Sequence, residues 1–313
     1  MNEIEEANDA MLDILMRAGS FIFIILLGYI LKKIGFFKDE DFHILSRITI
    51  RITLPCAIIT SFAGKQIDPA LLSLTFMAIG CGLIYIGIGY LINRNKSREQ
   101  QAFEMLNLPG YNIGTFVIPF AQSFLGAMGV ITVSLFDTGN AVICLGGAYS
   151  LAATVKNGNR FSLKRILLTL AKSVPFMTYM IMLLINVLKL PVPQFVLSVA
   201  GIGSNANAFM AMLMIGVGFK LEFGNKQQMG TVFKLLSIRY AVATALALVF
   251  YFLLPFELEV RQALVILAFS PIGSAVPGFT GELKGDVGLS SAINSFAMVI
   301  SITITVILLI VML

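Results

Sequence analysis

Three polar side chains lie inside apolar stretches of this chain, beside residues that interrupt helices. Asn112 and Thr115 flank Gly114, and Ser274 follows Gly273. Amide and hydroxyl groups at such places can hydrogen-bond a ligand carboxylate or ion, or they can cap backbone groups freed by the interruption. Both roles stay open from the residue types alone.

A carboxylate lies deep in the apolar stretch that follows. Asp137 is separated from the polar ends of this stretch, and Asn140 stands about one helical turn further on. An ionisable group inside a bilayer is costly and therefore indicates function. It could carry a proton, bind a cation or pair with the positive end of a broken helix. Because Asp137 would repel an anion, we favour a coupling or structural role over direct contact with an anionic substrate.

Five further residues are candidates for a polar route through the molecule. Asn205 and Asn207 lie within one apolar stretch, and Asn294 lies in a later one, at roughly the position that corresponds to the deep carboxylate. We expect these amides to line a central cavity. Arg47 and Arg51 are four residues apart, on one helix face. They either snorkel to lipid headgroups or form an electropositive vestibule that gathers anions.

Other kinds of chemistry lack their motifs in this sequence. It contains no P-loop, no Gly-x-Ser-x-Gly elbow and no His–Glu metal motif. The three cysteines, Cys56, Cys81 and Cys144, lack metal-ligand or redox spacing and are interpreted as packing residues. We therefore predict no enzyme activity, no metal and no cofactor.

The composition is typical of a membrane protein. Hydrophobic residues make up 58% of the 313 residues and charged residues only 12%, whereas soluble domains carry about 25% charged residues. The net charge of +5 could suggest nucleic acid, but the basic residues fall in short loops between apolar stretches. They are therefore interpreted as signals of membrane topology.

Ten apolar stretches are long enough to cross a bilayer, which needs roughly 20 residues per helix. They lie near residues 14–34, 43–63, 69–92, 107–125, 128–153, 163–188, 194–218, 231–254, 260–282 and 288–312. These stretches use nearly the whole chain and leave no soluble domain. The sequence therefore predicts an all-α membrane protein of ten transmembrane helices.

Lysine and arginine residues fall mainly in alternate loops. One set of loops carries fourteen of them: Lys32, Lys33, Lys38, Arg94, Lys96, Arg98, Lys156, Arg160, Lys164, Arg165, Lys220, Lys226, Lys234 and Lys284. The opposite set carries four: Arg17, Lys65, Lys189 and Arg261. Cytoplasmic loops are enriched in these residues. We therefore predict a multi-pass protein of the cell (inner) membrane with both termini extracytoplasmic.

A short sequence repeat relates the fourth stretch to the ninth. Ile113, Gly114, Gly126 and Gly129 each match a residue 159 positions further on, and both stretches continue Ile-Gly-hydroxyl, apolar residues and proline. Five stretches separate the two, so the halves would run in opposite directions through the membrane. This pattern predicts two inverted five-helix repeats, at residues 1–158 and 159–313.

Both matched stretches are poor continuous helices because glycine and proline interrupt them. The residues concerned are Asn112, Gly114 and Pro119 in one stretch, and Pro271, Gly273, Pro277 and Gly278 in the other. Freed backbone groups cannot face lipid, so they must be buried in protein or line a cavity. Paired broken helices mark substrate sites in transporters, and half-helix N-termini suit anions. A proline kink used only for packing is the simpler alternative.

Several segments together resemble the auxin efflux carrier family, whose members include bacterial malate and malonate permeases and the plant PIN-formed auxin exporters. They are Gly28 to Gly35, Leu45-Ser46-Arg47 through Leu54-Pro55, Asn112 through Pro119, Asp137-x-x-Asn140, and Gly216-Val217-Gly218 with Leu221. The resemblance covers essentially the whole chain, and the order and spacing of the segments carry it. It implies an NhaA-like fold in which the fourth and ninth helices cross as broken helices, in a transport domain that moves against a scaffold.

The same resemblance implies homodimers and the export or exchange of carboxylates. One departure concerns the seventh stretch, where a proline is expected near the middle and this chain has Asn205 and Asn207. We expect a secondary transporter that moves small organic anions, such as malate, malonate or auxin-like acids, by alternating access. Alternatives are a sodium- or proton-coupled symporter or antiporter of the same fold, and a membrane ligand sensor that does not transport.

Overall fold

The computed structural model describes residues 2–158, 161–219 and 226–312, and side chains within 12–158, 161–219 and 228–312. Every regular element in these ranges is a helix. Arg160 and Lys220, and the side chain of Lys226, which were counted among the loop charges, lie outside the described residues.

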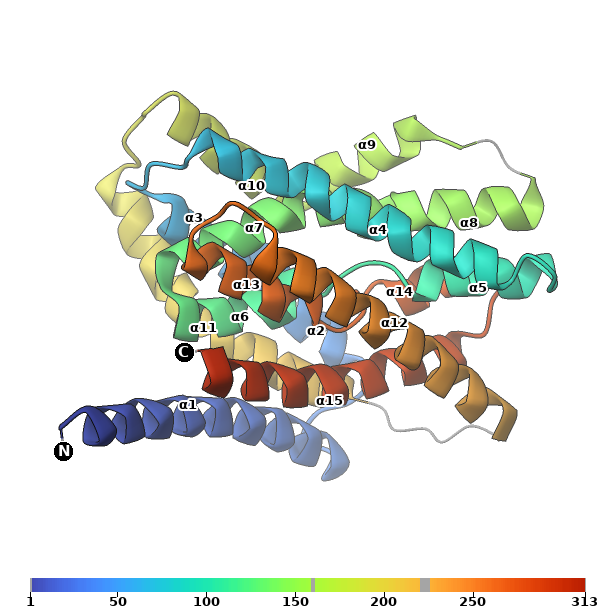
Figure 1. The fold of residues 1–313 in the computed structure, drawn as a ribbon, viewed down its shortest axis with the longest axis horizontal. Helices are drawn as coiled ribbons and strands as arrows, with labels where there is room; N and C mark the ends of the chain where they lie inside the picture. The colour runs from blue at the N-terminus through green and yellow to red at the C-terminus, as the bar shows by residue number, and fades with distance from the viewer. Residues whose placement is uncertain (1, 159–160, 220–225, 313) are drawn as a thin grey trace.

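The helices follow one another through short connections (Figure 1). The first half contains α1 (Asn2–Lys33), α2 (Asp41–Ile48), η1 (Thr49–Thr53), α3 (Leu54–Phe62), η2 (Pro69–Leu72), α4 (Ser73–Ile92), α5 (Arg98–Asn107), η3 (Ile113–Val117), α6 (Ile118–Phe120), η4 (Ala121–Leu125), α7 (Gly126–Val142), η5 (Ile143–Gly147) and α8 (Ala148–Asn157). The second half contains α9 (Leu163–Lys172), α10 (Val174–Val187), α11 (Gln194–Gly218), α12 (Lys226–Phe252), α13 (Leu258–Ala268), α14 (Val276–Glu282) and α15 (Val287–Met312). The segment η2 is a 3-10 helix, and the other η segments are π-helical.

Within the described residues, seven helices are long and apolar enough to cross a membrane, and the bent pair α9–α10 makes an eighth if it is one span. The two members of this pair meet at 81°. The predicted fourth and ninth spans are divided into shorter helices, α5 with η3 to η4, and α13 with α14. The structure is thus an all-helical, multi-pass membrane protein.

One apolar helical run is too long for a single crossing. The run Ile113–Asn157 has 45 residues, or about 67 Å at ~1.5 Å per residue, roughly twice the ~30 Å bilayer core. Gly126 divides it, with φ 61° and ψ −162°, a conformation that residues with a Cβ rarely adopt. The segment η3 before this glycine packs against α7 after it, so the chain turns back at Gly126.

The prolines in two of the helices do not break them. Pro55 and Pro119 each follow a π-helical segment, η1 and η3. The amides of Leu54 and Ile118, just before the prolines, donate to carbonyls five residues back. This wider turn accommodates a residue that has no N–H and whose ring crowds the preceding turn. The expectation that Pro119 interrupts its helix is therefore wrong, and the break lies before Ile113.

Glycines allow some of the long helices to pack backbone against backbone. A Cβ on Gly216 of α11 would lie 2.1 Å from the carbonyl oxygen of Ile25 on α1, and one on Gly28 would lie 2.6 Å from the carbonyl oxygen of Leu213. Close approach of this kind is characteristic of membrane helices, where small residues replace the hydrophobic effect as the basis of packing. The pair α1–α11 is thereby fixed along one side of the molecule.

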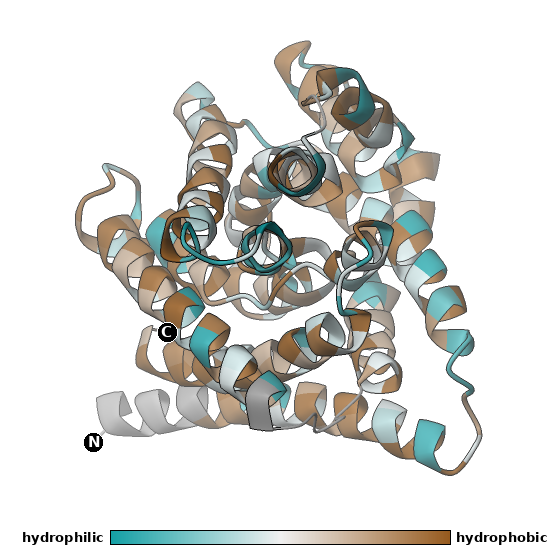
Figure 2. Ribbon diagram, turned by 90° about the vertical axis from the view of Figure 1, so that its right-hand side faces the viewer, coloured by the Kyte–Doolittle hydropathy of each residue, from teal (hydrophilic) through white to brown (hydrophobic). Residues whose placement is uncertain are grey.

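The outer surface of the molecule is apolar, and the long helices begin and end at the two ends of the bundle. Phe23, Phe76 and Ile202 are 66%, 75% and 76% exposed. Brown, the colour of hydrophobic residues, covers much of the outer helices in Figure 2. In Figure 1, α1 begins and α15 ends towards the left, whereas α4 and α8 end and α12 begins towards the right. Such a surface suits lipid and not water.

Candidate functional site

Two non-helical breaks meet in the middle of the molecule. The first, at residues 108–112, separates α5 from η3, and the second, at residues 269–275, separates α13 from α14. The backbone N–H of Asn112 donates to the carbonyl oxygen of Pro271 at 2.9 Å. The two stretches that the sequence matched with each other are thus in direct contact. The second break precedes Pro277, which lies in the first turn of α14 instead of interrupting a helix.

A buried arginine binds both breaks. Arg239 of α12 is 1% exposed, and its guanidinium donates to the carbonyl oxygens of Leu108 at 2.5 Å, Gly110 at 2.9 Å and Ser270 at 2.9 Å. These carbonyls follow the C-terminal ends of α5 and α13, where helices carry partial negative charge. The guanidinium therefore satisfies the freed acceptors and compensates both helix ends at once.

Two aromatic rings enclose this guanidinium. Its carbon lies 5.4 Å from the ring centroids of both Tyr85 and Tyr111, and the Tyr85 hydroxyl donates to the backbone carbonyl of Arg239 at 3.1 Å. Cations are attracted to aromatic faces when water is excluded. The rings therefore contribute to holding the charge of Arg239 between the two breaks.

The side-chain amide of Asn140 hydrogen-bonds the backbone of the first break, where the chain has no helical partner. Its Oδ1 accepts from the Tyr111 N–H at 3.0 Å, and its Nδ2 donates to the Tyr111 carbonyl at 2.9 Å. The same Nδ2 donates to Asp137 Oδ1 at 2.9 Å, and the Tyr179 hydroxyl donates to Asp137 Oδ2 at 3.0 Å. A Cβ built on Gly114 would lie 3.9 Å from Asp137 Oδ2, so the carboxylate also stands beside the first turn of η3, where negative charge is favourable.

The half-helix α5 is fixed by two polar clusters outside the breaks. Glu104 is fully buried and accepts from Lys234 Nζ of α12 at 2.8 Å and from Asn93 Nδ2 at 2.6 Å. One helical turn further, Asn107 accepts from Ser290 Oγ of α15 at 2.5 Å and donates to Thr280 Oγ1 of α14 at 3.2 Å. These bonds tie α5 to both halves of the chain and so position the break that follows it.

Two cavities border the contact between the breaks. The larger, about 330 Å³, and the smaller, about 140 Å³, have only Asn112 and Ser274 in common. Asn112 is buried, and its Oδ1 accepts from Thr115 Oγ1 at 2.5 Å. Its amide nitrogen has no hydrogen-bond partner among the described residues. Asn112 and Ser274 therefore offer neutral donors to a ligand in either cavity.

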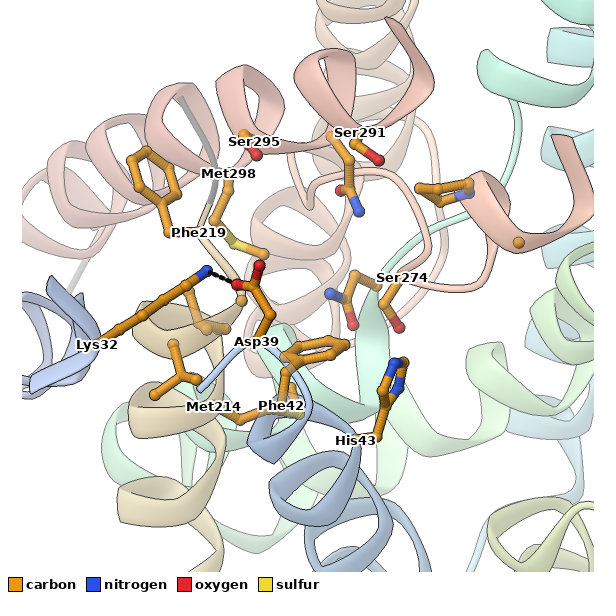
Figure 3. Close-up of a pocket in the computed structure, with 17 residues that line it drawn as sticks. Lys32, Asp39, Phe42, His43, Met214, Phe219, Ser274, Ser291, Ser295 and Met298 are labelled. Carbon is orange, nitrogen blue, oxygen red and sulfur yellow. Dashed lines mark ion pairs between the residues drawn. The ribbon is translucent and has the colours of Figure 1, made fainter. Parts of the chain in front are cut away.

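The larger cavity is lined by neutral polar groups and by a charged pair. Ser274, Ser291 and Ser295 border it, and so do Lys32 and Asp39, which form an ion pair at 2.8 Å (Figure 3). Asn294 also lines this cavity, and its Oδ1 has no hydrogen-bond partner within the described part of the chain. The arrangement can bind a polar solute by hydrogen bonds without a fixed opposite charge.

Most of the predicted site residues border these cavities. Ser274, Pro277 and Asn294 line the larger one, Gly114, Thr115, Asp137, Asn140 and Ser274 line the smaller one, and Asn112 lines both. Pro271 lies in the second break and contributes its carbonyl oxygen to Asn112. Pro119 is buried within its helix and is in the lining of neither cavity.

Four further predicted residues, besides Pro119 and Pro271, lie outside the lining of the two cavities. Asn205 is exposed on α11, and Arg47 and Arg51 are exposed on the second span, outside the lining of both cavities. Asn207 is buried, but its amide accepts from Thr53 Oγ1 at 3.0 Å and donates to Gln122 Oε1 at 2.9 Å. The side chain of Asn207 therefore connects helices and does not face a cavity.

Three side chains that hold the site or its neighbouring helices in place are not among the sequence predictions. Arg239 is an ionisable residue in the middle of an apolar stretch, so the rule that flagged Asp137 would also have found it. Gln122 and Tyr179 carry no comparable signal, because isolated polar or aromatic residues are frequent near membrane interfaces. Their roles follow from contacts with Asn207 and Asp137, which only the fold brings about.

Comparison with known proteins gives one informative relative. The chain is 24% identical over 211 residues to an uncharacterized transporter of Methanothermobacter thermautotrophicus, covering 65% of this chain and 67% of that protein. No family model matches the chain. With its apolar helices, the chain is a multi-pass membrane protein similar to a transporter.

Proposed function

We propose that this protein is a secondary transporter that moves small organic anions by alternating access, with its binding site where the two helix breaks meet. The proposal rests on the hydrogen bond from the Asn112 N–H to the Pro271 carbonyl oxygen, which joins the two breaks. Both cavities that border this contact include Asn112 and Ser274 in their lining. A solute bound there can be reached from either cavity in turn. The protein is accordingly a carrier and not an enzyme.

The proposed architecture is ten spans in two inverted repeats, residues 1–158 and 159–313, with an NhaA-like crossing of the fourth and ninth spans. Its support is that the matched stretches touch each other and that each ends a short helix, α5 or α13, before a second helix begins. The return of the chain at Gly126 separates the fourth span from the fifth. Membership of the auxin efflux carrier family is part of this proposal.

The proposed cargo is a carboxylate, such as malate, malonate or an auxin-like acid. Amide and hydroxyl donors from Asn112, Ser274 and Ser291 border the larger cavity. The acidic residue in its lining, Asp39, is already neutralised by Lys32. Charged acceptors form stronger hydrogen bonds than neutral ones do, so this set of donors favours an anion.

The proposed setting is the cell membrane, with both termini extracytoplasmic and two copies forming a homodimer. Support for the dimer comes from Asn205, whose exposed amide lies near the middle of α11 beside exposed Ile202 and Phe209. A polar group facing lipid at that depth is costly. A second protomer covering this face would remove the cost.

Counterflow in proteoliposomes tests the proposed function. Vesicles loaded with unlabelled malate, malonate or an aromatic carboxylate should accumulate the same labelled acid. Asn112→Leu should abolish this uptake, and Asn205→Leu, outside both cavities, should leave the uptake per folded protein unchanged. Absence of flux for a broad carboxylate panel would refute the proposal, and binding without counterflow would favour a ligand sensor.

A proton- or sodium-coupled carrier of the same fold is the second candidate. Asp137 lines the 140 Å³ cavity, and its carboxylate is held by Asn140 and Tyr179. An intramembrane carboxylate in a cavity can carry a proton or bind a cation. Flux that is indifferent to both sodium and pH gradients would exclude this candidate.

A further inference from the structure

An apolar cavity adjoins the larger polar cavity. It has a volume of about 440 Å³ and lies between α1, α11 and α15. Its lining consists of Ile22, Ile25, Leu26, Tyr29, Ile215, Phe219, Met298, Val299, Ile302 and Thr303. None of these described residues carries a charge, and the Thr303 hydroxyl donates to the Val299 carbonyl at 3.0 Å. The cavity therefore offers almost no polar group to a ligand.

The apolar and polar cavities meet at three shared side chains. Ile215, Phe219 and Met298 line both of them. Figure 3 shows Phe219 and Met298 on the side of the polar cavity away from Ser274. The Phe219 ring packs edge-on against Tyr29 of α1, with centroids 5.9 Å apart. The two spaces are thus neighbours that share these three side chains, polar at the helix breaks and apolar towards α1.

The apolar part faces the bilayer. Ile22, Leu26 and Val299 line it and are 39%, 51% and 45% exposed. These side chains lie on α1 and α15, within helices apolar enough to cross a membrane. A molecule dissolved in lipid can therefore reach the apolar cavity sideways, without passing through water.

We propose that the substrate is an amphipathic monocarboxylate whose apolar tail occupies this cavity while its carboxylate lies at Asn112 and Ser274. This inference rests on the proposed function and specifies the substrate class. The adjacency of a polar and an apolar cavity, with Ile215, Phe219 and Met298 in common, matches a ligand with one charged end and one apolar end. A second carboxylate on the tail would be stripped of water among Ile215, Met298 and Val299, which is unfavourable.

Binding of straight-chain monocarboxylates of two to eight carbons to the protein in lipid nanodiscs tests this assignment. Affinities are taken from the ligand-induced rise in thermal midpoint. Each buried methylene strengthens binding roughly four-fold, so octanoate should bind at least about 50-fold more tightly than butanoate even when its four extra methylenes are only partly buried.

Two tryptophan variants on α15 separate the cavity from the surrounding lipid. Val299→Trp fills the apolar cavity, whereas Val311→Trp alters a residue that is 76% exposed and outside both cavities. Val299→Trp should weaken octanoate binding about ten-fold or more, and butanoate binding about two-fold at most. Val311→Trp should change neither affinity.

The outcomes distinguish this inference from the function on which it rests. Equal octanoate affinities for the Val299→Trp and Val311→Trp variants would overturn the inference and leave the cavity to a lipid acyl chain only. Tighter binding of malonate than of octanoate would also overturn it while supporting an anion carrier. If neither malate, malonate nor any monocarboxylate bound or exchanged, the proposed function itself would fail.

Discussion

Replacing Arg239 by methionine should destabilise the protein more than any other single loss of an arginine described above. The side chain is 1% exposed and donates to three carbonyl oxygens, those of Leu108, Gly110 and Ser270. Methionine fills a similar volume but supplies neither donors nor charge. The substitution therefore leaves both breaks with buried, unpaired acceptors.

The size of the effect follows from these bonds. A hydrogen bond to a charged group contributes about 1.5–3 kcal/mol. Three bonds made by one side chain are not independent, so we take about 4 kcal/mol, slightly less than the lower end of their sum. A loss of ~1 kcal/mol in the free energy of unfolding lowers the thermal midpoint of a chain of this general size by roughly 2–4 °C. A loss of about 4 kcal/mol should therefore lower the midpoint by about 10 °C.

Arg261→Met provides the matched control. Arg261 donates to one carbonyl oxygen, that of Tyr251, at 2.8 Å, and it lies over one ring at 5.7 Å. Its loss should lower the midpoint by only about 4 °C. Thermal unfolding of both variants, followed by size-exclusion chromatography in one detergent, measures the difference. Equal midpoints for the Arg239→Met and Arg261→Met variants would refute the role assigned to Arg239.

Two further substitutions test the packing and the polar network. Gly216→Leu should prevent α1 from packing on α11, because a Cβ at this position lies 2.1 Å from the Ile25 carbonyl oxygen. The control variant Gly201→Leu has open space on the same helix and should fold normally. Equal yields of folded protein for the two variants would contradict this packing. In the Asp137→Asn variant, the new amide can still accept from Asn140 Nδ2 and donate to the Tyr179 oxygen. The thermal midpoint should therefore change by about 4 °C at most. Any flux driven by a pH gradient should disappear. Retention of that flux would exclude Asp137 as a proton carrier.

The membrane class and the approximate positions of the helices could be predicted because apolar length is a local property of the sequence. The positions of the breaks were less accessible. Pro119 suggested a break within its own helix, but the π-helical turn at η3 absorbs the proline, and the non-helical residues precede Ile113. A sequence shows that a helix is under strain without showing how neighbouring helices relieve it.

The candidate site was predicted where polar residues accompany glycine and proline, as at Asn112 and Ser274. Side-chain direction decided the other cases. Asn205 and Asn207 lie two residues apart and so point about 200° apart on a helix, and one is exposed while the other is buried. Which of them would face inward depends on the rotation of α11, which its packing against α1 and α3 determines.

The chemical accessibility of position 274 tests the central claim most directly. In a variant with Cys56, Cys81 and Cys144 replaced, Ser274→Cys should react with a membrane-impermeant methanethiosulfonate, because residue 274 borders both cavities. Ser301→Cys, at a fully buried position bound to Tyr240, should not react. If the two helix breaks form a solute site, the reaction at position 274 should also slow when a transported carboxylate is present. A cysteine at position 274 that is inert from both sides of the membrane would contradict the account.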